Sequence, residues 1–159
     1  MLTKEEFTRA VKANMDAVYR VAVNYLRDPT TAEDVCQETF LRLYKCRKSF
    51  SGDEHIRYWL IHVCINECRR TMSSSWQKAE YLEDISESAL LTSAEDQSML
   101  QLVMSLSRKY RMVLYLHYYE GYSTGEIAKL LHTLPSTVRS QLARGRDQLK
   151  QMLLEAENV

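Results

Sequence analysis

The segment from Ser136 to Arg146 carries side chains suited to binding a nucleic acid. Arginine can form paired hydrogen bonds with guanine, glutamine can form them with adenine, and hydroxyl groups can contact phosphates or base edges. Helical spacing places Val138, Leu142 and Leu149 on one buried stripe, so the other side chains face outward. These outward residues are Ser136, Thr137, Arg139, Ser140, Gln141, Arg144 and Arg146. We predict a helix that docks in the DNA major groove, with a solvated basic face as the alternative.

A capping box stands just before this segment. Ser123 and Glu126 lie three residues apart, so each side chain can bond the backbone N–H of the other and fix the start of a short helix. Ile127, Leu130 and Leu131 bury that helix. Because only residues 132–134 separate it from the next helix, the pair is predicted to form a helix-turn-helix. Ser123 is therefore counted among the predicted DNA-binding residues.

A different chemistry is offered between residues 28 and 45. The apolar stripe predicted to enter the core consists of Ala32, Val35, Cys36, Thr39, Phe40 and Leu43. On the opposite side lie Asp34, Gln37, Glu38, Leu41, Arg42 and Lys45, of which the first four combine acids, an amide and one leucine. Such a ridge favours a protein partner over DNA. The alternative is a single surface leucine among polar residues, which is common.

Aromatic and cationic side chains alternate between residues 50 and 70. Tyr58, His62, Ile65 and Arg69 are predicted to line one side of a helix, with Arg57 and Arg70 beside them and Phe50 in the preceding loop. Aromatic rings can stack on unpaired bases while cations hold the phosphates of a single strand. Aromatic residues that simply belong to the core remain an open alternative, because both roles use the same residue types.

The four cysteines, Cys36, Cys46, Cys64 and Cys68, lack the paired CxxC spacing of a zinc site or redox motif. We expect reduced thiols that pack as small hydrophobic groups. A thiol or metal sensor built on Cys64 and Cys68, with His62 nearby, is the alternative, but no fourth ligand is evident. We expect no bound metal and no cofactor. No nucleophile with a base and no glycine-rich phosphate loop occurs, so the chain is not expected to be an enzyme.

Composition predicts an all-α protein. The chain has four glycines and two prolines in 159 residues, and no long stretch alternates apolar with polar residues. Helices are predicted over residues 3–26, 56–70, 96–105, 108–119, 123–131 and 135–153. Another is predicted to start at the Asp28-Pro29 turn, with Asp28 as its cap and Pro29 at its first helical position. The first helix is predicted to bury a stripe of Phe7, Val11, Met15, Val18, Ala22 and Tyr25.

Charge divides the chain into parts. Residues 1–72 carry a net charge of +2, residues 73–99 carry −5 and residues 100–150 carry +5. We predict two small helical domains, 1–72 and 100–159, joined by an acidic linker over 73–99. The neighbouring opposite charges suggest that Glu80, Glu83, Asp84 and Glu87 restrain the basic domain in the free protein. No signal peptide or membrane-spanning run is evident, so the protein is expected to be cytoplasmic, without membrane insertion.

Four segments carry a family resemblance. YLRDPTTAEDVCQETFLRLYK, WLIHVCINECRR, YRMVLYLHYYEGYSTGEIAKLL and STVRSQLARGRDQL resemble the two domains of the extracytoplasmic-function group of bacterial sigma factors. The resemblance implies that residues 1–72 dock on the clamp helices of core RNA polymerase and capture the melted minus-ten element. It also implies that residues 100–153 recognise the minus-thirty-five element of promoter DNA. An anti-sigma factor is a plausible further partner, since many relatives have one.

The resemblance also suggests individual roles. Asp34, Gln37, Glu38 and Leu41 would face the polymerase, and the stretch from Phe50 to Tyr58 would hold a flipped base. Arg139, Ser140, Arg144 and Arg146 would face the upstream element, while Asn66 matches a polar position that contacts either DNA or a neighbouring helix. Two departures concern the recognition helix. Its turn is His132-Thr133-Leu134, where the family commonly has Gly, an aliphatic residue and a Ser cap, so Thr133 is expected to cap instead; and Gln141 replaces a usual Arg.

The rival hypothesis from another class is a free-standing repressor or activator with the same helix-turn-helix. Such a protein normally dimerises and binds a palindrome without polymerase. A run-off transcription assay separates the two, because only a sigma factor gives core polymerase new start sites.

Overall fold

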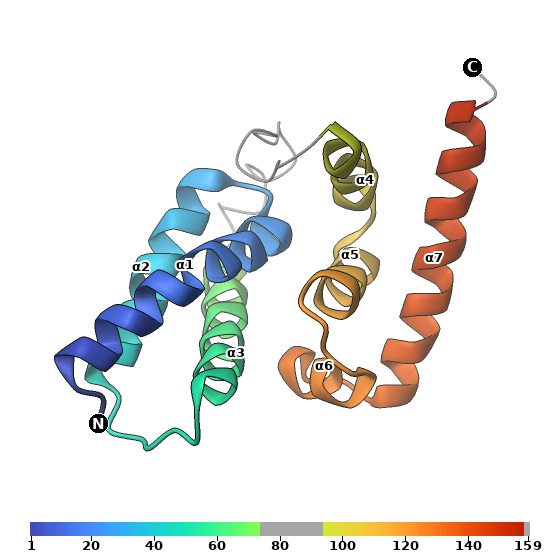
Figure 1. Ribbon diagram of the computed structural model, residues 1–159. Helices are drawn as coiled ribbons and strands as arrows, with labels where there is room; N and C mark the ends of the chain where they lie inside the picture. Colours follow the sequence, from blue (N-terminus) through green and yellow to red (C-terminus); the bar gives the residue numbers. More distant parts are fainter. Residues whose placement is uncertain (74–93, 158–159) are drawn as a thin grey trace. The chain divides into compact units, whose positions relative to one another are not determined.

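The computed structural model describes residues 1–73 and 94–157, whose regular elements are all helices. The predicted all-α fold class is therefore confirmed. The chain divides into two compact units, Met1–Ser86 and Glu87–Val159, and each is considered by itself (Figure 1). Most of the predicted linker, with Glu80, Glu83, Asp84 and Glu87, lies outside the described residues, so the linker boundaries and its restraining role stay predictions.

The first unit is a bundle of three helices, α1 (Lys4–Leu26), α2 (Pro29–Lys45) and α3 (Asp53–Met72), each packed against the other two. All six residues of the predicted α2 stripe are buried, which confirms that stripe. α3 contributes Ile56, Leu60, Ile61, Cys64, Ile65 and Cys68 to the core. These residues occupy more than one side of α3, which packs against both α1 and α2.

Local chemistry fixes the corner between α1 and α2. Arg27 ends α1 in a left-handed conformation with φ of 58°. Asp28 then caps α2, because its carboxylate accepts a hydrogen bond from the backbone N–H of Thr30 at 3.2 Å. Pro29 occupies the first helical position, where its missing N–H costs nothing. This corner agrees with the sequence prediction.

The structure corrects two details of this unit. Between residues 4 and 17 of α1 the buried side chains are Ala10, Asn14 and Ala17. Of the residues predicted to be in the core there, Met15 is 50% exposed, and Phe7 and Val11 are only half-buried. Small residues allow close helix packing there, and the Asn14 amide is satisfied by donating to the Ala10 carbonyl at 2.8 Å. α3 begins at Asp53 rather than near Ile56. Acids in the first turn are favoured by the helix dipole, so the polar run joins the helix.

The second unit contains α4 (Ala94–Ser105), α5 (Arg108–Leu114), the π-helical turn η3 (Tyr115–Tyr119), α6 (Thr124–Leu131) and α7 (Pro135–Glu157). α7 packs along α5 and α6 and buries Val138, Leu142 and Gly145. Two predicted core leucines, Leu131 and Leu149, are only half-buried. The α7 stripe therefore ends at Gly145, one turn earlier than predicted.

The predicted helix over 108–119 is α-helical only to Leu114 and ends in the π-helical turn η3. The Tyr115 and Tyr119 rings stack with centroids 5.4 Å apart, and the Tyr115 hydroxyl donates to Glu120 at 3.0 Å. Nearby, the wholly buried Arg111 donates to the Leu106 carbonyl at 2.8 Å. These contacts hold the end of α5 in a fixed shape beside α6 and α7.

The turn of the helix-turn-helix is closed by His132. This residue has φ of 55° and ψ of 48°, which is the left-handed conformation, and the N–H of Thr133 donates to the Ala128 carbonyl at 2.9 Å. The carbonyl of Leu134 accepts the first bond of α7, from Val138. Leu134 thus occupies the N-cap position of α7 that had been predicted for Thr133, because both His132 and Thr133 take part in closing the end of α6.

Candidate functional site

The four predicted docking residues of α2 share its outward side. Asp34 and Gln37 are exposed, Leu41 is 44% exposed and Glu38 is half-buried. Since the six core residues occupy the opposite side, this ridge is available to a partner. Spacings of three and four residues keep the side chains in one row.

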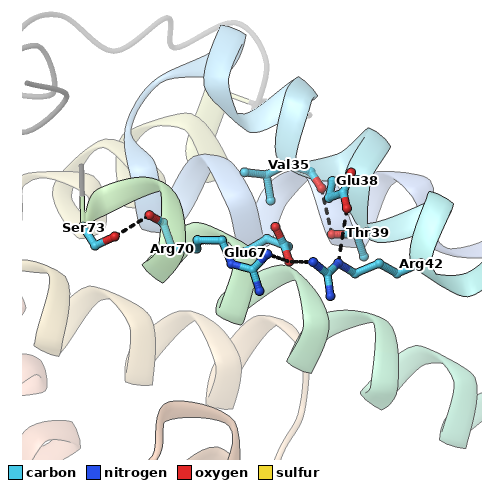
Figure 2. Close-up of polar contacts among 7 residues, drawn as sticks. All are labelled: Val35, Glu38, Thr39, Arg42, Glu67, Arg70 and Ser73. Atoms are coloured by element: carbon cyan, nitrogen blue, oxygen red, sulfur yellow. Dashed lines mark hydrogen bonds and ion pairs between the residues drawn. The ribbon is translucent and has the colours of Figure 1, made fainter.

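A network of ion pairs ties this ridge to α3 (Figure 2). Arg42 Nη2 lies 2.9 Å from Glu67 Oε1, and Arg42 Nε lies 3.3 Å from Glu38 Oε1. The second contact is close in distance but not aligned as a hydrogen bond. Arg70 adds a longer contact to Glu67, at 3.7 Å. Glu67 was missed in the sequence, although it continues the buried row of Leu60 and Cys64 at helical spacing.

The loop before α3 is ordered by an aromatic and hydrogen-bonded cluster. The ring of Phe50 packs edge-on against His55 and Trp59, with centroids 5.1 Å and 5.7 Å away. The Ser51 N–H donates to Nδ1 of His55 at 3.0 Å. Phe50 is half-buried in this cluster, and His55, which was not predicted as a functional residue, holds the loop in place.

The structure brings together part of the α3 surface that was predicted to bind single-stranded DNA. Arg57, Tyr58, His62 and Arg69 are half-buried and Asn66 is exposed, with helical spacings that place most of them along one side. Ile65 had been predicted on this side but is fully buried in the core. The face is therefore narrower and more polar than the sequence suggested.

The capping box of the helix-turn-helix forms as predicted. The Ser123 N–H donates to Glu126 Oε1 at 3.0 Å, and the Glu126 N–H donates to the Ser123 hydroxyl at 3.2 Å. Ile127 and Leu130, on the next turn of α6, are fully buried. The first helix of the motif is thus fixed at both its start and its core face.

The predicted recognition residues of α7 differ in their surroundings. Five of them are exposed, namely Ser136, Arg139, Ser140, Arg144 and Arg146, while Thr137 and Gln141 are half-buried. Arg146 donates from Nη1 to the Tyr118 hydroxyl at 2.9 Å, so its guanidinium is held beside η3. At about 100° per residue, Arg139 and Arg144 lie on different flanks of the helix, and one groove wall cannot meet all seven side chains equally.

Comparison with known proteins decides the family. The sequence matches Sigma-70 region 2 over residues 10–78 and Sigma-70 region 4 over residues 96–149. These two matches together span more than half of the chain. The protein belongs to the extracytoplasmic-function group of bacterial sigma factors, because the sigma-E factor of this group from Escherichia coli is 30% identical to it and is covered over 69% of its length. It is a transcription initiation factor that directs promoter recognition, and core RNA polymerase is its partner.

Individual relatives support the family assignment, and a solved structure supports the fold. The RNA polymerase sigma-H factor of Pseudomonas aeruginosa is 26% identical and aligns over 94% of this chain and 87% of its own length. The sigma-E factor of Escherichia coli is 30% identical over 72% of this chain and 69% of its own length. The solved sigma factor RpoE of Bartonella quintana, in complex with the anti-sigma factor NepR, has a TM-score of 0.73 at 19% identity and covers 94% of this chain and 97% of its own.

The thiols of this sigma factor are poorly placed for sensing. Cys36, Cys64 and Cys68 are buried, and burial raises the pKa of the Cys36 thiol to about 12. A hydrogen bond with Cys68, followed by burial, raises the pKa of Cys64. Because the thiolate is the reactive form, a raised pKa lowers reactivity. Among the described residues, no group of three or more potential ligands could hold a metal ion.

Over residues 1–73 and 94–157, no helix combines the length and apolar character needed to cross a bilayer.

Proposed function

We propose that residues 1–72 dock on core RNA polymerase and hold the melted minus-ten element, while residues 100–159 recognise the minus-thirty-five element. Docking is assigned to Asp34, Gln37, Glu38 and Leu41. The observation that carries this proposal is the α2 ridge itself, where Leu41 is 44% exposed among acids and an amide while the other side of the helix is buried. An apolar residue inside a polar, ordered ridge suits a protein partner.

DNA contacts are assigned to both units. The melted strand would meet Phe50, Arg57, Tyr58, His62, Asn66 and Arg69. Upstream duplex DNA would meet Ser123, Ser136, Thr137, Arg139, Ser140, Gln141, Arg144 and Arg146. The exposed Arg139 and Ser140 near the start of α7 are the best-supported base contacts, since the first turns of a recognition helix enter the groove.

The test is run-off transcription with core RNA polymerase of the source bacterium and fragments of its genome. Addition of the protein is expected to yield discrete new transcripts with defined start sites. Absence of transcripts together with tight, polymerase-independent DNA binding would instead support a free-standing regulator. Leu41→Ala should reduce all transcripts equally, whereas Arg139→Ala should change which promoters are used.

A second partner is an anti-sigma factor. The observation that favours it is that the Bartonella RpoE protein was solved in complex with the anti-sigma factor NepR. CnrH, a 23% identical protein with a TM-score of 0.64, was also solved with a protein partner, the cytosolic domain of CnrY. Co-purification of this sigma factor from its own host, with and without cross-linking, would recover such an inhibitor if one holds it inactive.

We also infer that the protein acts by binding, without catalysis or a cofactor, in the cytoplasm where polymerase and DNA reside. Its contribution is then a shift of the closed-to-open promoter equilibrium, which requires only that it bind the open form more tightly. Purified protein that supports transcription with core polymerase, nucleotides and magnesium alone would support this inference.

A further inference from the structure

We propose that Glu67 of α3 is a positioning residue for polymerase docking, because it holds Arg42 and thereby fixes the carboxylate of Glu38. This proposal rests on the assignment of Glu38 to the docking ridge. Glu67 itself is not exposed to a partner, since its side chain is only 9% exposed. Its influence must therefore pass through the groups that it contacts.

The carboxylate of Glu67 is buried away from water. A carboxylate removed from water is costly unless it is paired and hydrogen-bonded. Here the compensation comes mainly from Arg42, at 2.9 Å, and only weakly from Arg70, at 3.7 Å. Because Arg42 comes from the neighbouring helix, the buried charge anchors an α2 side chain at a defined place (Figure 2).

The guanidinium of Arg42 is planar and rigid, so fixing one edge also fixes the direction of the other donors. With Nη2 on Glu67, Nε lies 3.3 Å from Glu38, which is an ion-pair distance although the two groups are not aligned as a hydrogen bond. Glu38 is 45% exposed at its side chain, which leaves the carboxylate accessible to the polymerase.

The anchored Arg42 differs from an arginine in an ordinary ion pair on the protein surface. An exposed Glu and Arg four residues apart attract each other only weakly, and their long side chains remain mobile. An Arg anchored on a buried carboxylate loses that mobility within the protein. Glu38 then meets a preset cation, and less side-chain freedom is lost when the polymerase binds.

The experiment measures the affinity of the full-length protein for core polymerase without DNA, in a double-mutant cycle. Glu67→Gln keeps the shape of the side chain but removes the charge that holds Arg42. We expect about three- to tenfold weaker binding, the range for losing one well-placed charged contact. In a Glu38→Gln background, the same Glu67→Gln change should have no further effect. Glu5→Gln, which removes an exposed charge from the first turn of α1, is the matched control and should leave affinity unchanged.

A second variant covers the case in which Glu67→Gln fails to fold. Arg42→Lys keeps a positive charge for Glu67 but lacks the fork that reaches both carboxylates. It should weaken core binding to a similar extent while the melting temperature stays close to that of the parent protein.

The outcomes separate this proposal from the docking assignment. If Glu38→Gln weakens binding and Glu67→Gln weakens it equally in both backgrounds, Glu67 acts as a structural tie and the proposal is overturned. Lower thermal stability with unchanged core affinity would overturn it as well. If Glu38→Gln itself has no effect, the docking role of Glu38 falls, and the present proposal falls with it.

Discussion

Gly145 of α7 lies so close to Leu114 of α5 that a Cβ at position 145 would stand 3.0 Å from Leu114 Cδ1. The same Cβ would be 3.4 Å from that of Tyr110. Leu114 is 3% exposed and cannot easily move aside. α7 therefore crosses α5 at a distance that glycine allows without displacing Leu114.

Gly145→Ala is expected to lower the free energy of unfolding by about 1 kcal/mol, because overpacking costs roughly 1–3 kcal/mol and better helix propensity returns at most about 1. Urea denaturation followed by circular dichroism would measure this. The control is Gly125→Ala in α6, where the nearest atom is the Ser123 hydroxyl at 3.9 Å. There we expect a gain of about 0.5–1 kcal/mol. Equal gains at both positions would contradict the close contact.

His132 offers a test of the helix-turn-helix turn. A left-handed conformation costs a residue with a Cβ roughly 1 kcal/mol, so His132→Gly should be neutral to slightly stabilising. His132→Val should lower stability by about 1–2 kcal/mol, since a branched side chain resists this conformation. Thermal unfolding of both, with the tolerant His132→Asn as control, would check the expectation. A harmless Val would argue against the left-handed turn.

Arg139 should distinguish base recognition from phosphate binding. Its replacement by Ala is expected to cost about 1–3 kcal/mol in binding to the preferred upstream element and to relax specificity at one base pair. Binding by the polymerase holoenzyme to a set of singly substituted promoters would measure both effects. A uniform loss across all sequences would make Arg139 a phosphate contact instead. Gln148→Ala, exposed farther along α7, serves as control.

His55 should matter for promoter opening. Its Nδ1 accepts the Ser51 N–H and its ring supports Phe50, so His55→Ala should loosen the loop. We expect about two- to tenfold fewer open complexes, the effect of losing roughly 1 kcal/mol of hydrogen bonding. His55→Asn keeps an acceptor and should recover part of the loss. Permanganate reactivity of unpaired thymines would report opening, while core affinity should stay unchanged; a change in affinity alone would refute this role.

Cys36 predicts a stability change at alkaline pH. Its pKa is near 9 in an unfolded chain and about 12 in the folded protein. Below pH 9 the Cys36 thiol keeps its proton in both the folded and the unfolded state, so its contribution to the free energy of unfolding is fully present. Between pH 9 and 12 the unfolded state releases the proton first, so the free energy of unfolding falls. Comparing urea midpoints at pH 8 and 10 should show a smaller drop for Cys36→Ala than for the parent. Cys46→Ala, at a half-buried site, should behave like the parent.

Much of the helical framework follows from local sequence. The Asp28 cap, Pro29 and the six-residue stripe of α2 were predicted, because caps and apolar spacing act within a few residues. The Ser123–Glu126 capping box was likewise predicted. For the interaction surfaces, the sequence indicated candidate residues by type, and their roles stay predictions.

Contacts between helices decided the rest. The burial of Glu67 and its pairing with Arg42, the exposure of Met15 and the burial of Ile65 depend on which side of each helix its neighbours cover. A periodic pattern marks an apolar stripe but does not say how far a partner helix extends along it. The π-helical turn at Tyr115–Tyr119 and the hold of Tyr118 on Arg146 have the same origin.

The sequence by itself determined the family, the helices and the side chains able to bind polymerase or DNA, since these depend on residue type and short-range spacing. Only the tertiary structure decided which of those side chains are held by others. Arg146 of α7 donates a hydrogen bond to Tyr118 of η3. Glu38 pairs with Arg42 of its own helix, and Arg42 is in turn held by Glu67 of α3. Such engagement requires two helices to be packed, and packing energy depends on the whole surface they share.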